Sequence, residues 1–444
     1  MEYQLTQRSL PLDDSWDVIV VGGGPAGCSA AASAAREGAK TLLLEATGAL
    51  GGMGTSGLVP AWCPFTDKQQ IIYGGIAERV LKQCISGMPH VAEDHFDWTP
   101  IDSELLKRIY DDLVTDAGAS ILFHTVLSDV DVDDQGNIQA LLVSNKGGLS
   151  AYKAKVYIDC TGDADLSAWA GAEIEKGDEE IGELQAATHC FMITNVDEYH
   201  YRHGEWMHGS NPKSPVFKMA ADPKYDLIID NHLCNNIVGP ATVGFNAGHL
   251  WGVDNTDPVS LSKGLIKGRR IAAQMRDALA EYHPHAFAGS YLVSTGSLMG
   301  IRETRRVMGD YVLRVEDYAE RRSFDDEIGR NSYYLDIHMS KEAIRRKGHD
   351  PEKVARRYNP GESHGIPYRC LTPRGLNNLL VAGRCISADR AVQGSVRVMP
   401  VCLVMGEAAG MAGAFAATTD RHNVHMIDVK QLRKRLREEG AYLP

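Results

Sequence analysis

The stretch Val18-Ile-Val-Val-Gly-Gly-Gly-Pro-Ala-Gly27 decides the fold of this 444-residue chain. Its apolar first half predicts a buried strand, and its glycines predict a tight turn into the Ala-rich segment that follows, which is typical of a helix. A second apolar strand, Thr41-Leu-Leu-Leu44, comes next and ends at Glu45. Strand, turn, helix, strand and acid thus follow one another in the order of a dinucleotide-binding βαβ unit.

The spacing of the glycines has a physical reason in such a unit. Gly22 permits the tight turn, Gly24 lets a pyrophosphate approach the backbone, and Gly27 lets the helix pack closely on the strand. The helix N-terminus then offers unpaired N–H groups and the positive end of its dipole to the phosphates. Glu45 lies 23 residues after Gly22, where an acidic side chain accepts hydrogen bonds from a ribose. This unit alone leaves FAD and NAD open.

Length and composition indicate a globular protein of two domains. Apolar residues make up 44% and charged residues 23% of the chain, as in ordinary globular enzymes, and the length is about three times that of a typical domain. The net charge is −12, and no basic stripe alternates with aromatic residues, so we expect no nucleic-acid partner. We expect a small-molecule substrate and an electron acceptor whose identity is open. A homo-oligomer is compatible with the sequence.

Cysteine usage and hydropathy predict a cytoplasmic protein without a membrane partner. The nine cysteines are odd in number and include no CxxC pair, which argues against a disulfide framework, a structural zinc and an iron–sulfur cluster. Asp13 and Asp14 lie where the apolar part of a signal peptide would be. The most apolar segment, residues 400–417, contains Glu407 and three glycines, so it predicts a buried helix and not a membrane span.

The middle of the chain differs from its ends. After predicted helices at 74–87 and 102–117, closely spaced strand patterns between 120 and 159 predict a β-meander inserted in a parallel-sheet domain. Residues 165–295 are rich in aromatic residues, His, Asn and Pro and have weak periodicity. We interpret them as an inserted substrate domain.

The chain then returns to the pattern of its first domain. Residues 379–382 predict a buried strand, and Pro400 is suited to the first turn of a helix. The predicted fold class is α/β: a Rossmann-like nucleotide-binding domain, whose parallel sheet carries a β-meander, plus an inserted α+β substrate domain. The predicted boundaries are 1–165, 296–314 and 365–444 for the nucleotide-binding domain, and 166–295 and 315–364 for the substrate domain.

Three further segments put small residues where a dinucleotide would lie. The glycine-rich loop 48–57 suggests backbone lying against a flat ring or a phosphate, with a flexible loop as the alternative. The turn 158–163 closes a strand at its C-terminal end, where open α/β sheets bind ligands. Residues 383–400 lead into a helix whose positive N-terminus would point into the dinucleotide site. Packing on the Ala-rich first helix would explain the glycines of that helix but not the Arg384/Arg397 pair.

Arginines and histidines supply the candidate catalytic residues. Three arginines lie within residues 302–306, Arg302 and Arg305 among them, and they suit carboxylates or phosphates through paired N–H donors. Salt bridges with neighbouring acids are the alternative. Among 16 histidines, His249 and His364 lie in segments rich in glycine and polar residues, where a histidine can deliver or take a proton near neutral pH. No HExxH motif or close His/Asp cluster occurs, so we expect no metal site.

Five motifs follow one another along the chain: Val20-Val-Gly-Gly-Gly-Pro-Ala-Gly27, Gly51-Gly-Met-Gly-Thr-Ser-Gly57, Ile158-Asp-Cys-Thr-Gly-Asp163, Gly300-Ile-Arg-Glu-Thr-Arg305, and Asn378-Leu-Leu-Val-Ala-Gly-Arg384 through Arg397-Val-Met-Pro400. Together they resemble the FAD-dependent oxidoreductase family with a glutathione-reductase-type flavin fold, akin to fumarate reductase flavoproteins. The inserted domain matches no motif of that family. A second GxGxxG and a redox-active cysteine pair are both missing, which removes the chemistry of the disulfide reductases.

The resemblance implies FAD as the cofactor and assigns candidate residues to it. The implied cofactor residues are Gly22, Gly24, Pro25, Ala26 and Gly27 at the pyrophosphate turn, Glu45 at the ribose, Gly51, Gly52, Met53 and Thr55 near the phosphates or flavin, Gly162 near the adenosine half, Gly383 and Arg384 near the ribityl chain, and Arg397, Met399 and Val401 at the flavin ring.

These expectations combine into a FAD-dependent oxidoreductase that transfers a hydride between the flavin and a small polar substrate. The flavin supplies the redox chemistry, and the protein supplies orientation and charge. Arg302, Arg305 and Arg384 would bind the substrate, and His249 or His364 would handle the proton. Oxidation of a hydroxyl group, for example of a sugar or a hydroxy acid, is favoured slightly over reduction of an activated double bond. A tRNA-modifying flavoprotein and a non-catalytic flavin-binding protein are the remaining alternatives.

Overall fold

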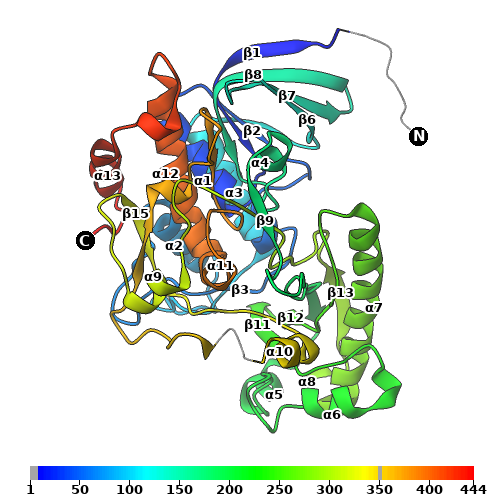
Figure 1. The fold of residues 1–444 in the computed structure, drawn as a ribbon. Coiled ribbons are helices and arrows are strands. Elements are labelled where there is room, and N and C mark those ends of the chain that lie inside the picture. The colour runs from blue at the N-terminus through cyan, green and yellow to red at the C-terminus, as the bar shows by residue number, and fades with distance from the viewer. Residues whose placement is uncertain (1–8, 349–352) are drawn as a thin grey trace.

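Two hydrophobic cores organise the molecule. The computed structural model describes residues 9–348 and 353–444. The larger core draws on residues between Val18 and Leu443, whereas the second core lies within residues 187–301. Figure 1 shows the larger part around helices α1 (Pro25–Arg36) and α12 (Met399–Ala417), with the part that holds the second core at the lower right.

The larger part is built on a seven-stranded sheet in the order β5-β2-β1-β8-β7-β6, with β17 also paired to β8. Its strands are β1 (Leu12–Val21), β2 (Thr41–Leu44), β5 (Ser120–Leu122), β6 (Val126–Val132), β7 (Ile138–Asn145), β8 (Gly148–Asp159) and β17 (Leu379–Val381). The pairs among β5, β2, β1, β8 and β17 are parallel, whereas β8, β7 and β6 run antiparallel. The predicted parallel sheet with a β-meander is confirmed.

The helices of this part begin and end close to the predicted positions. They are α1, α2 (Ile76–Ser86), α3 (Ser103–Asp116), α12 and α13 (Val429–Glu438). The side chain of Asp102 caps α3 by accepting from the backbone N–H groups of Glu104 and Leu105, as expected for an acid before the first turn. Pro400 stands in the first turn of α12, where its missing N–H group leaves no hydrogen bond unmade.

Helices α1 and α12 approach each other through small residues. A Cβ atom added at Gly406 would lie 2.1 Å from the carbonyl oxygen of Ala26, and one at Gly410 would lie 2.1 Å from that of Ala30. Such a distance is shorter than any real contact, so only glycine permits this spacing. The predicted packing of this glycine-rich helix on the first helix is confirmed, and it places the N-termini of both helices at one cavity.

Among the described residues, α12 is the one helix long and apolar enough to qualify as a membrane span by length and composition, and 94% of its qualifying window is buried inside the protein. It forms part of the larger core, as the sequence predicted.

The second part is an antiparallel sheet covered by helices. Its strands, in the order β11-β12-β10-β13, are β10 (Phe191–Thr194), β11 (Leu233–Gly239), β12 (Thr242–Ala247) and β13 (Tyr291–Thr295). Its helices are α5 (Glu198–His203), α6 (Val216–Ala221), α7 (Pro258–Tyr282) and α8 (Pro284–Phe287). The long helix α7 contributes Ile271, Met275 and Leu279 to the second core. This is the predicted α+β domain.

The segment 315–364 packs differently from its predicted assignment to the substrate domain. It holds α9 (Val315–Glu320), β15 (Glu327–Asn331) and α10 (Lys341–Lys347), and β15 pairs with β16 (His364–Pro367). Tyr318, Ile328 and Leu335 are buried in the larger core. We therefore group the region around α9 and β15 with the sheet that carries α1. The sequence did not predict this grouping because the apolar faces of these elements are too short to show a clear period.

The shorter elements connect these parts. They are β3 (Ala61–Trp62) paired with β4 (Thr99–Pro100), β9 (Ile174–Lys176) paired with β14 (Arg305–Val307), and helices α4 (Asp165–Trp169) and α11 (Arg390–Val396).

Candidate active site

A cavity of about 1540 Å³ is lined by residues of both parts of the molecule. Ligand cavities commonly measure about 300–1,000 Å³, so this one has room for a dinucleotide and a second ligand. Twelve of the predicted cofactor residues line it, namely Gly22, Gly24, Pro25, Ala26, Glu45, Gly52, Met53, Gly162, Gly383, Arg384, Arg397 and Met399.

The turn before α1 has the shape that a pyrophosphate requires. Gly22 has φ +96°, and a Cβ atom there would lie 2.5 Å from the carbonyl oxygen of Cys160, so only glycine fits. Gly24 is the N-cap of α1, and no side chain among the described residues caps it. A Cβ atom at Gly24 would meet no atom within 4 Å. Gly24, Pro25 and Ala26 line the cavity, so the uncapped N-terminus of α1 faces it, which fits an anionic phosphate.

Glu45 stands at the end of β2 and lines the same cavity. Its Oε2 accepts a hydrogen bond of 2.7 Å from the N–H of Gly23, and its Oε1 accepts one of 2.7 Å from the N–H of Thr47. A carboxylate has about four lone-pair positions, so each oxygen can still accept from a ribose hydroxyl. The side chain thus fits the predicted ribose contact and also holds the turn.

The N-terminus of α12 contributes to another part of the cavity lining. Its N-cap is Val398, and none of the described side chains caps it. Arg397 lies just before it and donates from Nη2 to the backbone oxygen and to Oδ2 of Asp336, both at 2.9 Å. The positive end of α12 and the Arg397 guanidinium together favour negative charge on a ligand here.

Four predicted cofactor residues lie outside the cavity lining, so their contact with FAD stays a prediction. A Cβ atom at Gly27 would lie 1.7 Å from the carbonyl oxygen of Gly22, so Gly27 serves the packing of α1 on the turn. Gly51 has φ +97° and closes its loop. Thr55 donates from Oγ1 to the carbonyl oxygen of Leu50 at 2.5 Å. Val401 is fully buried in the larger core.

Two of the predicted substrate arginines are paired with acids. Arg384 lines the cavity but donates from Nη2 to Oδ1 of Asp163 at 2.8 Å. Arg305 is outside the lining and donates to Oδ1 of Asp165 at 2.8 Å. Burial and the neighbouring Asp163 carboxylate raise the pKa of Asp165 to about 6, against the opposing effect of Arg305. The alternative interpretation, salt bridges with nearby acids, therefore describes Arg305, and its catalytic assignment is corrected.

His364 also differs from its prediction. It is the first residue of β16 and fully buried, outside the cavity lining. Its Nδ1 lies 2.5 Å from the hydroxyl oxygen of Tyr358, and the ring of Tyr318 lies beside it at 5.8 Å between ring centres. Burial, together with Arg330, lowers the pKa of His364 to about 3. A buried, neutral histidine of this kind supports packing and does not reach a substrate.

Arg302 also lines the cavity and, unlike Arg384 and Arg305, its guanidinium forms no ion pair with a carboxylate of the described residues. Its Nη1 donates to the carbonyl oxygen of Ala186 at 2.8 Å and to Oγ1 of Thr188 at 2.7 Å. Its Nη2 has only long contacts, 3.4 Å to Nε2 of His232 and 3.4 Å to Oδ1 of Asn246. One end of the guanidinium is thus fixed, and the other end can still donate to a ligand.

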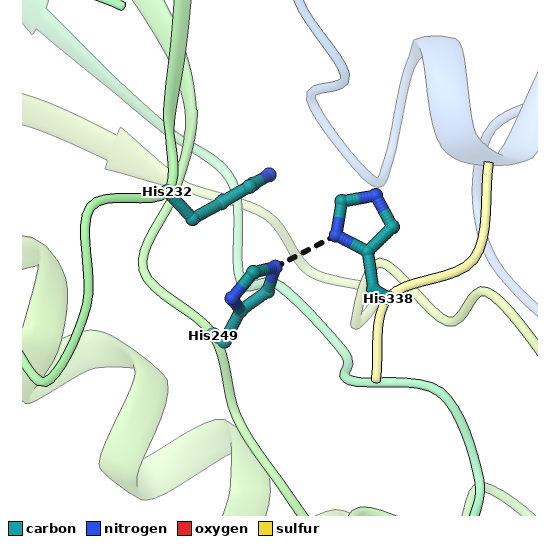
Figure 2. Close-up of side chains that lie close together, drawn as sticks. All are labelled: His232, His249 and His338. Atoms are coloured by element: carbon teal, nitrogen blue, oxygen red, sulfur yellow. Dashed lines mark hydrogen bonds between the residues drawn. The ribbon is translucent and has the colours of Figure 1, made fainter. Parts of the chain in front are cut away.

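The structure brings His249 together with two histidines that the sequence analysis did not single out. Figure 2 shows His232, His249 and His338 around one space. His232 precedes β11, His249 follows β12, and His338 lies between β15 and α10. One ring nitrogen of each lies within 4.8 Å of those of the other two, and Nε2 of His249 lies 2.8 Å from Nδ1 of His338. All three line the cavity.

Two aspartates hold the outer nitrogens of this cluster. Nδ1 of His249 lies 2.7 Å from Oδ2 of Asp230, and Nε2 of His338 lies 3.1 Å from Oδ1 of Asp336. Burial opposes the charge of Asp336, but the nearby His338, Arg397 and Arg302 hold its pKa well below the usual range. The Asp336 carboxylate is therefore ionised and accepts hydrogen bonds.

The imidazoles themselves are neutral at pH 7. Burial lowers the pKa of His249 below its ordinary value, although Asp230 opposes the change. Burial and Arg302 lower the pKa of His338 to about 4. Burial, His249 and Arg302 lower the pKa of His232 as well. Each ring therefore keeps one unprotonated nitrogen, which can act as a base or as a ligand.

This cluster corrects the expectation that the chain has no close His/Asp group. Its members come from segments up to 106 residues apart, so no local spacing connects them. One signal was present: Asp230-Asn-His232 and Asp336-Ile-His338 repeat the same Asp-x-His pattern. In the second of these the aspartate contacts the histidine side chain, whereas in the first it accepts from the N–H of His232 and reaches His249.

Five cysteines line the cavity: Cys63, Cys160, Cys190, Cys234 and Cys402. Burial raises the pKa of the Cys160 thiol well above its ordinary value and that of Cys402 to about 12. Burial raises the pKa of Cys63 and Cys190 to about 12 and that of Cys234 to about 11. The thiols therefore stay protonated at neutral pH, and a protonated thiol is a poor nucleophile.

Comparison with known proteins identifies the family of this chain. Among solved structures, a geranylgeranyl bacteriochlorophyll reductase-like protein from Thermoplasma acidophilum is 13% identical, with 98% of this chain and 85% of that chain covered and a TM-score of 0.47. A p-nitrophenol 4-monooxygenase from Pseudomonas putida is 12% identical, with 97% and 81% covered and a TM-score of 0.42. A family model described as FAD dependent oxidoreductase matches residues 17–436. The chain belongs to this family of FAD-dependent oxidoreductases, and FAD is its cofactor.

Proposed function

We propose that this enzyme oxidises a hydroxyl group of a small polar substrate bound beside the histidine cluster. The observation that carries the proposal is the His249–Asp230 pair, which lies with Arg302 in the cavity that the cofactor residues also line. Oxidation of a hydroxyl group needs an acceptor for the O–H proton and an acceptor for the hydride. When bound, FAD supplies the second of these.

His249 has the features of a proton acceptor. Because the Asp230 carboxylate can only accept, Nδ1 of His249 carries the hydrogen and Nε2 keeps its lone pair. The same carboxylate fixes the orientation of the ring and stabilises it once it takes a proton, as in other His–Asp pairs. The depressed pKa keeps His249 unprotonated at neutral pH, which is the state that a general base requires.

Arg302 and Asn246 are suited to hold the substrate. Nη2 of Arg302 and Oδ1 of Asn246 both line the cavity and have only a 3.4 Å contact between them. A guanidinium donates to a carboxylate or a hydroxyl, and an amide oxygen accepts from a hydroxyl. The pair therefore favours a substrate that carries several oxygen atoms, such as a hydroxy acid or a sugar.

The test is anaerobic bleaching of the flavin absorbance with a panel of hydroxy acids, sugars and amines. We expect one class of hydroxyl compound to bleach the enzyme at a rate that rises to saturation. His249→Gln should slow that bleaching about 100-fold or more, in the range of a lost general base, with unchanged flavin content. His208→Gln is the matched control, because His208 lines the same cavity outside the cluster.

Two outcomes would overturn the proposal. In the first, no hydroxyl compound bleaches the enzyme, but an activated alkene rapidly reoxidises the photoreduced enzyme. That result would identify the enzyme as a reductase. In the second, the His249 variant bleaches as fast as the wild type, which would exclude His249 as the proton acceptor.

A further inference from the structure

We propose that His232, His249 and His338 form a binding site for one divalent first-row transition metal ion such as Zn²⁺. Three imidazole nitrogens that converge on one space are a ligand set that such ions prefer. The three ligand atoms lie within 4.8 Å of one another. Tetrahedral ligands at about 2.1 Å from a metal are roughly 3.4 Å apart, so the three nitrogens already lie near the spacing that one ion requires.

The outer hydrogen bonds determine which nitrogens face inward. Oδ2 of Asp230 requires a hydrogen on Nδ1 of His249. The Asp336 carboxylate, whose Oδ1 lies 3.1 Å from Nε2 of His338, favours a hydrogen on that nitrogen. The facing atoms, Nε2 of His249 and Nδ1 of His338, then both carry lone pairs, yet they lie 2.8 Å apart. In this tautomer two lone pairs face each other at 2.8 Å, an arrangement that a metal ion between or beside them would stabilise.

The surroundings of the cluster match those of known metal ligands. Histidines that bind metal typically donate their other N–H to a carboxylate, which fixes the tautomer and raises the basicity of the ligand atom. His249 and His338 both have this arrangement. Asp230 and Asp336 also supply two negative charges next to the space. These charges offset those of a divalent ion and of the neighbouring Arg302.

Three protein ligands leave a fourth position for an oxygen atom of a ligand in the cavity. Arg302, whose Nη2 is 3.4 Å from Nε2 of His232, would bind a carboxylate next to that position. A metal with Arg302 beside its open position favours a 2-hydroxy acid over a sugar as the substrate. This substrate assignment rests on the proposed function, whereas the metal site does not. A hydroxyl bound to the metal would lose its proton more readily. With Nε2 of His249 bound to the metal, that proton would pass to water in the cavity, and His249 would hold the metal in place of accepting the proton itself.

Metal content tests the site directly. Protein without a histidine tag is dialysed against chelator and then against Zn²⁺ and analysed by mass spectrometry of the metal. We expect one Zn²⁺ per chain in the wild type and in His208→Gln, and at least a 100-fold loss of affinity in His232→Gln, His249→Gln and His338→Gln. Asp230→Asn should lower the affinity for Zn²⁺ about 10- to 100-fold, the usual effect of removing a carboxylate partner of a ligand. Flavin content and melting temperature verify that each variant is folded.

X-ray absorption of zinc in the wild type keeps the test decisive if a variant does not fold. The site predicts a nitrogen shell at about 2.0–2.1 Å with imidazole scattering, whereas a shell of sulfur at about 2.3 Å would assign the ion to the cavity cysteines and overturn the proposal. Absence of stoichiometric zinc in the wild type, or unchanged binding in all three histidine variants, would also overturn it. These readouts do not use turnover, so a failed bleaching assay rejects the proposed function without affecting the metal site.

The substrate step has its own readout. Zinc-loaded enzyme should be bleached at least tenfold faster by 2-hydroxy acids than by sugars, and removal of zinc should abolish the difference. Equal rates for both classes, or a preference that survives chelation, would reject the 2-hydroxy acid assignment and leave the metal measurement as it stands.

Discussion

Glu45 connects two functions at a single residue. Its two carboxylate oxygens accept hydrogen bonds from the N–H groups of Gly23 and Thr47, and the residue lines the cavity where the ribose is expected. Loss of the side chain therefore removes a ligand contact and leaves two turn N–H groups without their partner. An unpaired buried donor costs about 1–3 kcal/mol.

Glu45→Ala should lower the affinity for FAD by about tenfold or more, an effect of the size of one lost charged hydrogen bond. The ratio of flavin to protein absorbance after extended dialysis measures the effect. Glu104→Ala, on the exposed surface of α3, is the control and should keep the wild-type ratio. Equal flavin occupancy in the two variants would show that Glu45 does not contact the cofactor.

His364 should make folding stability depend on pH. Its pKa is about 6.5 in an unfolded chain and about 3 in the folded protein. Between these values the unfolded chain binds the extra proton, so stability is complete above pH 6.5 and is lost as the pH falls. Between pH 6.5 and pH 4.5 this residue alone should lower the free energy of unfolding by about 2 kcal/mol. Urea denaturation at both pH values measures the slope, and His364→Gln should reduce it. An unchanged slope would contradict the assignment.

The difference between predicted and observed histidines has a physical cause. The sequence around His364 is rich in glycine and polar residues, which resembles a loop, but burial depends on Tyr318 and Tyr358 from other segments. His232 and His338 were missed for the same reason, since their proximity arises only when the two domains fold. Local patterns identified the phosphate turn because all of its parts lie within thirty residues.

At the scale of elements, the contact between α1 and α12 depends on the close approach of their two backbones. Ser29 and Ser33 of α1 donate from Oγ to the carbonyl oxygens of Leu403 and Glu407 of α12, at 2.6 Å and 2.8 Å. These bonds form only because Gly406 and Gly410 let the helices approach. The sequence predicted this packing because the two small-residue faces could be seen in the separate helices, although their serine contacts could not.

Gly410→Ala should destabilise the protein by about 1–3 kcal/mol, the usual cost of overpacking, because its new methyl group would meet the backbone of Ala30 at 2.1 Å. Gly413→Ala in the same helix is the matched control. Its methyl group would meet the flexible end of Ile158 at 3.2 Å, and alanine gains about 1 kcal/mol of helix propensity. Chemical denaturation followed by circular dichroism compares the two, and equal destabilisation would contradict the role of Gly410.

At the scale of the whole molecule, the cavity separates two independently packed cores. The sequence predicted both domains and the ends of the main helices, because each has its own period and caps. It did not predict that residues such as Tyr318 and Ile328 would join the larger core. That assignment depends on which surface is left uncovered after the sheet has formed, and no local period records it.

Removal of FAD should lower the melting temperature, because the cofactor binds the folded chain and not the unfolded one. Addition of FAD to the apoprotein at about 100 times its Kd should raise the free energy of unfolding by about 2.7 kcal/mol. Thermal denaturation over a range of FAD concentrations measures this. FMN, which lacks the adenosine half that would reach Glu45, should give a smaller increase at equal concentration. A melting temperature independent of FAD would contradict the assigned site.

The pairing of β17 with β8 and of α12 with α1 also has a consequence for biosynthesis. A chain emerges from the ribosome N-terminus first, and the segments made early fold before the later ones are present. The turn at Gly22 is made about 360 residues before the segment from Gly383 to Met399 that completes the cavity lining. Cofactor capture therefore follows the synthesis of this later segment. A chain that ends before residue 399 should be free of flavin, because α1 then lacks α12, the helix on which it packs.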